Sequence, residues 1–537
     1  MGQKLPVLNA RFRILLLVGG AALLALALLG ALFPREPAYQ GRRLSVWLRD
    51  VPPLGSGFTD PNQPAHQALQ HFGTNAIPFL LEMLSARDPD WKVDGVRWLQ
   101  NKYEVNVPVT LADEKREHAV NGFQALGRLA EPAIPQLSAI VTGPDKGDAL
   151  YALAALRAIG GPQTMPIIFS VLTNDDAFLR EGALFLVGNF GGHAKPAVPL
   201  LLKNLEADKP GIRMNAAIAL GQIGLAPELV VPALIHTLTA DTGPVQIAAA
   251  TALAAFGTNA IAALPALRAL AESPDDGLRR AARLAVVRVQ CELRDGGIIR
   301  GPKDRKRIAL VFTGHEYGEG GEIILGELAK HRGRASFFLT GAFLTNPALT
   351  NLVRRMQNER HYVGPHSDQH LLYCSWERGR TNLVTEEQFQ QDLLGNVAKL
   401  PTYHDGVRRL SRYFLPAFEH YNRDIADWAR ACGWTLINYT PGTRSNADYT
   451  GEADKNFVSS QKIFDSILAH ERNDPDGLNG FILLLHVGCG PGRTDKFPAR
   501  FGELLDVLAG RGYEFVRVDE LLRPPRDPNF PGGGFRR

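Results

Sequence analysis

The chain is poor in cysteine. Its 537 residues contain four, scattered through the second half: Cys291, Cys374, Cys432 and Cys489. Cysteines spaced this widely exclude the disulfide framework of small secreted domains and the close cysteine pairs of a zinc knuckle. Stability must therefore come from hydrophobic cores, and a chain of this length needs two or more of them.

The chain also lacks a broadly basic surface. Its net charge is +4, but residues 1–50 alone carry +5, so the rest of the chain sums to −1. Proteins that bind nucleic acid need positive charge to contact the phosphates. We therefore expect no nucleic-acid partner. The hydrophobic content of 45% and charged content of 21% are those of folded protein, not of a disordered chain.

Only one long apolar run is present. Residues 14–33 carry no charge and, at about 1.5 Å per residue, match the roughly 30 Å of a bilayer core. No Ala-x-Ala cleavage site precedes Pro34, which favours an uncleaved anchor over a signal peptide. Basic residues flank both ends of the run, so the positive-inside rule does not give its orientation.

The first half of the chain repeats a phrase in which a loop glycine precedes a proline that opens an apolar helix pattern. The prolines of five copies are spaced 31, 33, 33 and 33 residues apart: Pro135, Pro166, Pro199, Pro232 and Pro265. Proline suits the first turn of a helix, where its missing N–H costs nothing. A second, alanine-rich helix pattern follows each one.

A period near 33 residues predicts an α-solenoid of stacked helical pairs. The phrase lacks the motifs of ankyrin and tetratricopeptide repeats and resembles short HEAT-type repeats. We expect residues 40–292 to form this repeat domain. Two roles stay open for it, a surface that binds a protein partner and a spacer between the membrane and the second half.

Beyond a charged, Gly-rich stretch at Arg294–Lys306, which reads as a linker, short apolar strands alternate with helices. Strands are expected at residues 308–312, 335–339, 435–438, 481–485 and 515–518. Such alternation predicts a parallel sheet or barrel, with its chemistry on the loops after the strands. Among these loops, His366 and His370 have the i, i+4 spacing that places two imidazoles on one face of a helix turn.

Three segments resemble the polysaccharide deacetylase (NodB-homology) family, in the family's order: Arg334–Gly341, Gly364–His370 and Leu484–His486. The resemblance covers residues 305–523 and implies a distorted (β/α) barrel. It also implies that His366 and His370 hold a divalent metal, expected to be zinc, and that His486 is the catalytic acid. The metal would polarise an acetamide carbonyl and activate water.

Two motifs depart from the family pattern. The family's first motif ends in two aspartates, a base and a metal ligand, where this chain has Thr313 and Gly314. Its third motif has an arginine where this chain has Leu415. In one interpretation, His315 completes the metal site and Glu316 becomes the catalytic base. In the other, the site binds sugar without hydrolysing it.

Residues that follow two later strands could form the rim of a sugar site. We expect Pro416, Phe418, Tyr439 and Arg444 to bind substrate, because aromatic and polar side chains there would line a sugar-binding groove. Glu419 and Tyr421 could line the same groove, with less support.

Together these features predict a multidomain protein, an α-solenoid followed by a (β/α) barrel. Residues 1–36 would be a cytoplasmic tail and anchor, 305–523 the deacetylase-like domain, and 524–537 a disordered tail. The main body would be periplasmic or extracellular, and the substrate an acetylated polysaccharide or cell-envelope glycan. The alternative is a non-catalytic scaffold that binds glycan.

Overall fold

The computed structural model describes residues 36–52, 63–103, 110–401 and 412–524, and the chain divides into two compact units. Unit 1 is Met1–Gly161 and unit 2 is Pro162–Arg537. The predicted anchor at residues 14–33 and the predicted C-terminal tail beyond residue 524 lie outside the described residues.

Unit 1 is almost entirely helical. Apolar residues at helical spacing bury one face of each helix, as in α4, where Ile77, Leu80 and Leu84 face the core. The elements of unit 1 are β1 (Ala38–Tyr39), β2 (Arg42–Arg43), α2 (Leu44–Leu48), α3 (Pro64–Phe72), η1 (Gly73–Ala76), α4 (Ile77–Leu84), α5 (Asp90–Tyr103), α6 (Ala112–Leu126), η2 (Gly127–Ala133), α7 (Ile134–Val141) and α8 (Lys146–Ile159).

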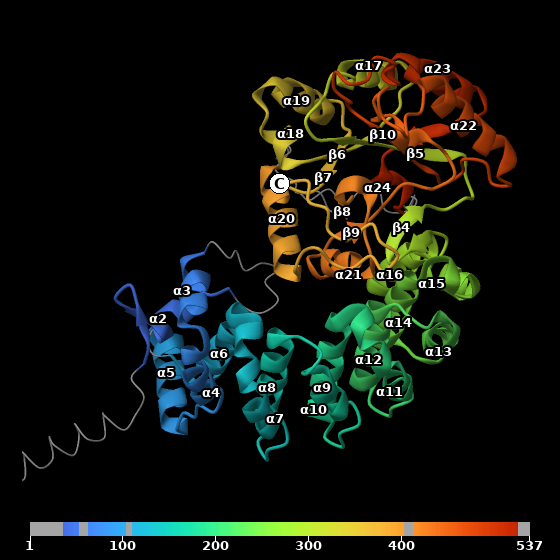
Figure 1. Cartoon of the computed structure of the whole chain (residues 1–537). Helices are drawn as coiled ribbons and strands as arrows, with labels where there is room; N and C mark the ends of the chain where they lie inside the picture. Colours follow the sequence, from blue (N-terminus) through green and yellow to red (C-terminus); the bar gives the residue numbers. More distant parts are fainter. Residues whose placement is uncertain (1–35, 53–62, 104–109, 402–411, 525–537) are drawn as a thin grey trace, which may run out of the picture. The chain divides into compact units, whose positions relative to one another are not determined.

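Unit 2 begins with further helical pairs, drawn in teal and green in Figure 1. The second helices form a continuous inner row, in which α12 packs between α10 and α14, and α14 packs against α16. The elements are α9 (Met165–Val171), α10 (Ala177–Val187), η3 (Gly188–Ala197), α11 (Val198–Asn204), α12 (Pro210–Ile223), α13 (Pro227–Ala240), α14 (Gly243–Leu253), η4 (Ala254–Ala263), α15 (Leu264–Leu270) and α16 (Asp276–Arg288).

Four of the five repeat prolines open a helix as the sequence predicts. Pro135, Pro166, Pro199 and Pro265 each lie in the first turn of α7, α9, α11 and α15. The prediction is wrong for Pro232, which lies inside α13. That helix starts earlier because Pro227 already supplies a first-turn proline, after Ala226 turns the chain with a φ of 53°.

Small residues let the inner helices of the repeats approach closely. A Cβ on Gly221 of α12 would come within 2.6 Å of the Ala252 Cα on α14. Within the described residues, one stretch of helix, Gly243–Leu270, is long and apolar enough to cross a membrane, with a mean hydropathy of 1.7. It is weak support for a span, since half of it is buried and Gly257, at a φ of 53°, breaks it into successive repeat helices.

The segment expected to be a linker is ordered over its first half, so that prediction is wrong there. β3 (Glu292–Arg294) and β4 (Gly297–Arg300) form an antiparallel hairpin, and β4 is fully buried. Asp295 and Gly296 make its turn with φ values of 46° and 84°, which an Asp-Gly pair adopts readily. Buried Ile298 then bridges to Ile437 in the following α/β part.

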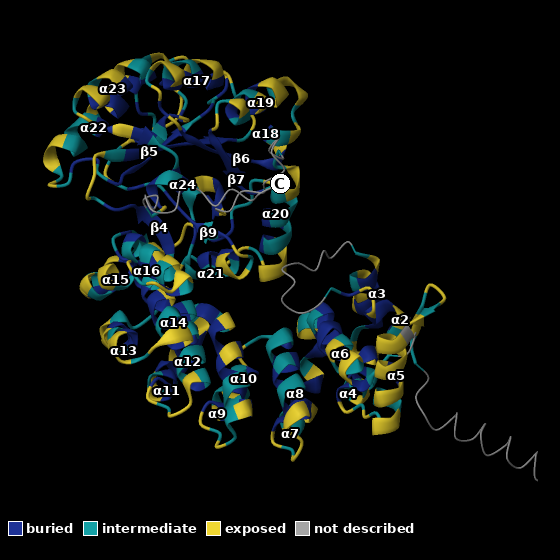
Figure 2. Ribbon diagram, turned by 180° about the vertical axis from the view of Figure 1, so that it is seen from behind, coloured by how far each residue is buried: buried dark blue, intermediate teal, exposed yellow. Residues whose placement is uncertain are grey.

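The α/β part is built on a parallel sheet with the order β10-β5-β6-β7, to which β11 is added on β5. Figure 2 shows β5, β6 and β7 almost wholly in the colour of buried residues. Their bounds are β5 (Arg307–Gly314), β6 (Ser336–Leu339), β7 (Tyr362–Pro365), β10 (Ile482–His486) and β11 (Glu514–Val516), and a separate parallel pair is β8 (Tyr413–Phe414) with β9 (Thr435–Leu436).

Alternate residues of each strand enter different cores, as a pleated strand requires. On β5, Ile308, Leu310 and Phe312 pack under the covering helices, whereas Ala309 and Val311 enter a second core. The helices of this part are α17 (Gly321–Lys330), α18 (Gly341–Thr345), η5 (Pro347–Leu349), α19 (Thr350–Asn358), α20 (Glu386–Lys399), η6 (Ala417–Glu419), α21 (Arg423–Ala431), η7 (Ser445–Ala447), α22 (Ser460–Asn473), α23 (Pro498–Gly510) and α24 (Val518–Leu521).

Single backbone hydrogen bonds connect the strand ends beyond the sheet itself. The Leu415 N–H donates to the Pro365 carbonyl at 3.3 Å, which joins the end of β7 to the segment after β8. The Thr440 N–H donates to the Ile482 carbonyl at 3.0 Å, which joins the segment after β9 to β10. The first bond lies at the carboxyl end of β7, and the second lies at the first residue of β10.

Candidate functional site

The predicted site residues follow the carboxyl ends of the strands. His315 comes directly after β5, His366 directly after β7, and His486 is the last residue of β10. Glu419 lies in the segment that follows β8. In parallel sheets these ends are where ligands bind, because the loops that leave them can vary without disturbing the strands.

His366 and His370 do not lie on a helix turn, so that part of the sequence interpretation is wrong. Both are in a loop after β7, in which Ser367 has a φ of 80° and His370 a φ of 55°. Two buried side chains of α20 hold this loop: Asp392 accepts the N–H groups of residues 368 and 369, and the Asn396 Oδ1 accepts the His366 N–H at 2.8 Å.

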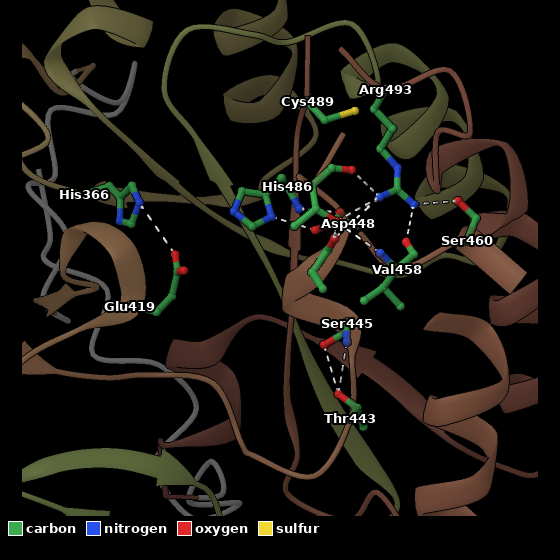
Figure 3. A network of polar contacts seen from close by, with 12 residues as sticks. His366, Glu419, Thr443, Ser445, Asp448, Val458, Ser460, His486, Cys489 and Arg493 are labelled. Atoms are coloured by element: carbon green, nitrogen blue, oxygen red, sulfur yellow. Dashed lines mark hydrogen bonds and ion pairs between the residues drawn. The ribbon is translucent and has the colours of Figure 1, made fainter. Parts of the chain in front are cut away.

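The tautomer of the buried His366 ring follows from its backbone partner. The His366 Nδ1 lies 2.9 Å from the Leu415 carbonyl oxygen, which can only accept. Nδ1 therefore carries the proton, and the Nε2 lone pair is directed away from that carbonyl. The Glu419 Oε1 lies 3.8 Å from this Nε2, as Figure 3 shows.

Glu419 reaches this position through a tight turn. Phe418 and Glu419 have φ values of 59° and 51°, a left-handed conformation that costs non-glycine residues about 1–3 kcal/mol each. The turn is held because the Glu419 N–H donates to the Pro416 carbonyl and the Asn438 side-chain amide donates to the Glu419 carbonyl. The result is a carboxylate whose side chain is 10% exposed.

His486 is held by Asp448, which comes from the loop after β9. The Asp448 carboxylate accepts two hydrogen bonds, from the His486 Nδ1 at 2.6 Å and from the His486 N–H at 2.8 Å (Figure 3). Because Asp448 is 3% exposed, this pair is shielded from water. Because Asp448 binds Nδ1, the Nε2 atom is the ring nitrogen that can exchange a proton with a substrate, as in a positioned acid or base.

His315 and Glu316 lie at the edge of the site. The His315 Nδ1 is 3.1 Å from the Thr340 hydroxyl, and its ring stacks on His370 with the centroids 4.2 Å apart. The Glu316 side chain is 62% exposed and its nearest partner is His315, at 3.7 Å. Of the two glutamates, it is therefore Glu419 that the fold brings to His366.

The burial of these groups shifts their pKa values in different directions. Burial, with the neighbouring His370, holds the pKa of His366 well below its usual value, and it lowers the pKa of His370 to about 4. Burial raises the pKa of Glu419 to about 7, although His486 opposes this. Burial also acts to lower the pKa of His486, but the charge and hydrogen bond of Asp448 outweigh it and the pKa is raised.

A divalent metal would find suitable donor atoms here. His366 and His370 stay neutral at neutral pH, the form that coordinates metal, and Glu419 adds a buried carboxylate. The buried Thr313 hydroxyl, at the end of β5, has no hydrogen-bond partner, so a polar ligand there would satisfy it. The chemistry of these residues fits such an ion.

The donor atoms of these side chains do not surround a single point in this structure. Among the described residues, no group of three His, Cys, Asp or Glu side chains is placed to hold a metal ion. The rings of His315 and His370 are inclined by only 14° to each other, so their in-plane lone pairs do not converge. The predicted set of His315, His366 and His370 remains a prediction.

The predicted substrate residues are only partly gathered at the site. The Phe418 ring is 42% exposed and contacts the His370 ring, with centroids 4.4 Å apart. Pro416 is buried at the base of the same turn. Tyr439 is half-buried. Burial is the main cause of its raised pKa, and the negative charge of Glu419 adds to the effect. Arg444 is exposed, and its backbone is held in the loop: its N–H donates to the Ser466 hydroxyl and its carbonyl accepts from the Ala447 N–H.

The sequence interpretation gave Glu419 little weight and assigned no role to Asp448. Asp448 lies in the polar loop after β9, and nothing in its spacing relates it to His486, 38 positions later. Glu419 could have been found as an acidic residue in a strand-following segment that is otherwise apolar, in Leu-Pro-Ala-Phe-Glu.

Comparison with protein-family models identifies both halves. Residues 300–437 match the polysaccharide deacetylase family, and residues 169–254 and 198–287 match HEAT repeats. The prediction of a C-terminal deacetylase domain preceded by HEAT-type repeats is therefore confirmed.

Two curated relatives are peptidoglycan-N-acetylglucosamine deacetylases. One, from Bacillus cereus, is 26% identical over 229 residues, which are 42% of this chain and 72% of the relative. The other, PgdA of Listeria monocytogenes, is 26% identical over 220 residues, which are 41% of this chain but 39% of that longer relative.

Similar solved structures include a carbohydrate esterase and a pseudoenzyme. The family 4 carbohydrate esterase PdaA of Bacillus subtilis is 20% identical, with a TM-score of 0.34, over 42% of this chain and 84% of its own. A family 4 pseudoenzyme of Bacillus anthracis is 17% identical, with a TM-score of 0.33, over 44% of this chain and 72% of its own. The assignment rests on the sequence matches, not on these likenesses.

Proposed function

We propose that this chain, whose C-terminal part matches the polysaccharide deacetylase family, removes acetyl groups from an N-acetylated cell-envelope glycan, with ester-linked acetyl groups as a second possible target. The observation that carries the proposal is the pairing of His366 with Glu419 and of His486 with Asp448, on segments at or after the carboxyl ends of the strands. A sugar-binding module would need no positioned acid beside a buried carboxylate.

In the proposed reaction, Glu419 and His486 move the protons. Glu419 accepts a proton from water as the water oxygen bonds to the acetamide carbonyl carbon. His486, positively charged beside Asp448, donates its Nε2 proton to the nitrogen of the sugar as the C–N bond breaks. The products are acetate and a free amine on the sugar, and one proton passes on from Glu419 to restore His486.

His366 and His370 are the residues that we propose would hold a divalent metal, of which zinc suits the two imidazoles best, while Glu419 stays free to act as the base. Such an ion polarises the carbonyl and makes bound water more acidic. Thr313 and Gly314 cannot replace the missing aspartates, so we assign the lost carboxylate function to Glu419, which reaches the site from the other side, after β8.

The remaining sequence predictions enter the proposal as its context. The strands would close into a distorted barrel, for which the links from Leu415 to Pro365 and from Thr440 to Ile482 are support. Residues 14–33 would anchor the protein in a membrane with its main body outside the cytoplasm, where peptidoglycan lies. The repeats would bind a partner or hold the catalytic part at a distance from the membrane.

Acetate release from purified peptidoglycan tests the proposal. The full chain, supplied with Zn²⁺, should release acetate and leave free amines on the glycan, and His486→Ala should lower the rate by about 10²- to 10⁴-fold. Equal acetate release from His486→Ala would remove the proposed acid. Glycan binding without acetate from any N- or O-acetylated substrate would favour the alternative of a non-catalytic scaffold.

A further inference from the structure

The surface around the site is rich in exposed aromatic rings. Among the described residues, eight Trp, Phe and Tyr side chains are exposed, and four of them lie in the α/β part: Tyr317, Trp376, Phe418 and Tyr449. Each of the four lies next to a site residue or next to another of the four. Tyr317 follows His315 by two positions, and the Tyr449 ring lies 5.0 Å from that of His486.

The rings of Phe418 and Trp376 form a row that leads away from His370. The Phe418 centroid lies 4.4 Å from that of His370, and the Trp376 centroid lies 6.4 Å from that of Phe418. The two aromatic rings are nearly perpendicular, at 83°. Two ring-to-ring steps thus separate Trp376 from His370, which places Trp376 beside the site and not in it.

Trp376 is exposed but held in place. Its side chain is 63% exposed, yet its ring stacks on His420 with centroids 4.0 Å apart. It follows Ser375, whose N–H donates to the Thr381 carbonyl at 2.9 Å and whose carbonyl lies 2.9 Å from the His420 Nε2. A ring fixed before binding loses little conformational entropy when a ligand stacks on it.

The loop that bears Trp376 is tied to the turn that bears Glu419. The Arg380 guanidinium donates to the Tyr421 carbonyl at 3.0 Å and to the Asp295 carboxylate at 2.7 Å. The Asn422 side-chain amide donates to the Arg380 carbonyl at 2.7 Å. The aromatic pair therefore keeps a fixed position relative to the carboxylate of the site.

We propose that Trp376 and Phe418 form a platform for the pyranose ring next to the sugar that is deacetylated, which stacks on Trp376 and is flanked by the perpendicular Phe418 ring, so that the protein selects a glycan chain over a single acetylated sugar. The C–H faces of a pyranose are apolar and slightly positive, which matches the negative face of an aromatic ring. The platform's place beside the reacting sugar rests on the proposed function, but its ability to bind does not.

Binding of defined sugars to the full chain in the His486→Ala background tests the platform without turnover. The probes are N-acetylglucosamine and tetra-N-acetylchitotetraose, titrated by calorimetry. Trp376→Ala should weaken tetramer binding by about 3- to 10-fold, the value of one aromatic stack, and leave monomer binding unchanged. Trp376→Phe, which keeps a ring, should recover most of the affinity.

Trp91→Ala is the matched control, since Trp91 is an exposed tryptophan of unit 1, 76% exposed, and its loss should change neither affinity. Equal tetramer binding by Trp376→Ala and the parent would overturn the platform, as would an equal loss for monomer and tetramer, or no binding of either sugar by the parent. Tetramer binding that depends on Trp376 would stand even if the chain with His486 intact released no acetate, so the two proposals fail separately.

Discussion

Replacing Asp448 by asparagine tests the acid of the site directly. Asp448 contributes both its negative charge and a hydrogen bond that raise the pKa of His486. Without them, only the charge of Glu419 opposes the lowering of the His486 pKa by burial. The pKa of His486 should therefore fall below its usual value of about 6.5. The imidazole would then be neutral at neutral pH and would no longer be a ready proton donor.

The energetic effect follows from the two hydrogen bonds that the carboxylate accepts. Asparagine can still accept the His486 N–H, but it loses the charge-assisted bond to Nδ1, which should lower the free energy of unfolding by about 1.5–3 kcal/mol. The sign of the pH dependence should also change. A raised pKa in the folded state stabilises the wild type most below about pH 6.5, and this contribution is lost as the pH rises through the folded-state pKa.

Titration of ¹³C-labelled histidine Cε1 signals by NMR measures the shift. Asp506→Asn is the control, because Asp506 contacts His331 at 2.9 Å in another Asp–His pair but is 76% exposed on its side chain. It should leave the His486 signal unchanged and alter stability by less than about 1 kcal/mol. An unchanged His486 titration in Asp448→Asn would refute the reasoning.

Three further predictions concern other parts of unit 2. Gly221→Ala should lower the free energy of unfolding by about 1–3 kcal/mol in denaturant titrations, since its Cβ would clash with the α14 backbone at Ala252; an unchanged value would contradict this. Arg423→Ala removes hydrogen bonds to the Ile223 and Gly224 carbonyls that join the repeats to α21, so it should lower the calorimetric Tm by a few degrees, and an unchanged Tm would contradict this. In the metal-free protein, acidification from pH 6.5 to 4 should cost up to about 3 kcal/mol through His370, whose folded pKa of about 4 lies below the unfolded value, and His370→Asn should remove that slope.

Local patterns predicted most of the fold. The 33-residue proline spacing and the apolar strands identified the helical pairs and the sheet, because helix starts and strand burial depend on neighbouring residues. The prediction failed at Pro232 and at the hairpin after Cys291. Each place carries a local signal, Pro227 in the first and the Asp-Gly turn at Asp295 in the second. The prediction followed the proline spacing and the linker-like composition instead.

Site residues could be predicted from the sequence only where they lie within one short segment. His366, His370 and His486 were found because each lies within a short motif. Glu419 depends on two consecutive left-handed residues and on Asn438 from the segment after β9, and Asp448 meets His486 only because the loop after β9 packs against the end of β10. Contacts of this kind are fixed by tertiary structure and leave no regular spacing in the sequence.

The central claim is that the carboxylate of this site is Glu419 and not Glu316. Acetate release by the isosteric variants Glu419→Gln and Glu316→Gln, each supplied with Zn²⁺ and N-acetylated peptidoglycan, tests it most directly. We expect a loss of about 10²- to 10⁴-fold for Glu419→Gln and near wild-type release for Glu316→Gln. Loss of activity in Glu316→Gln with full activity in Glu419→Gln would contradict it.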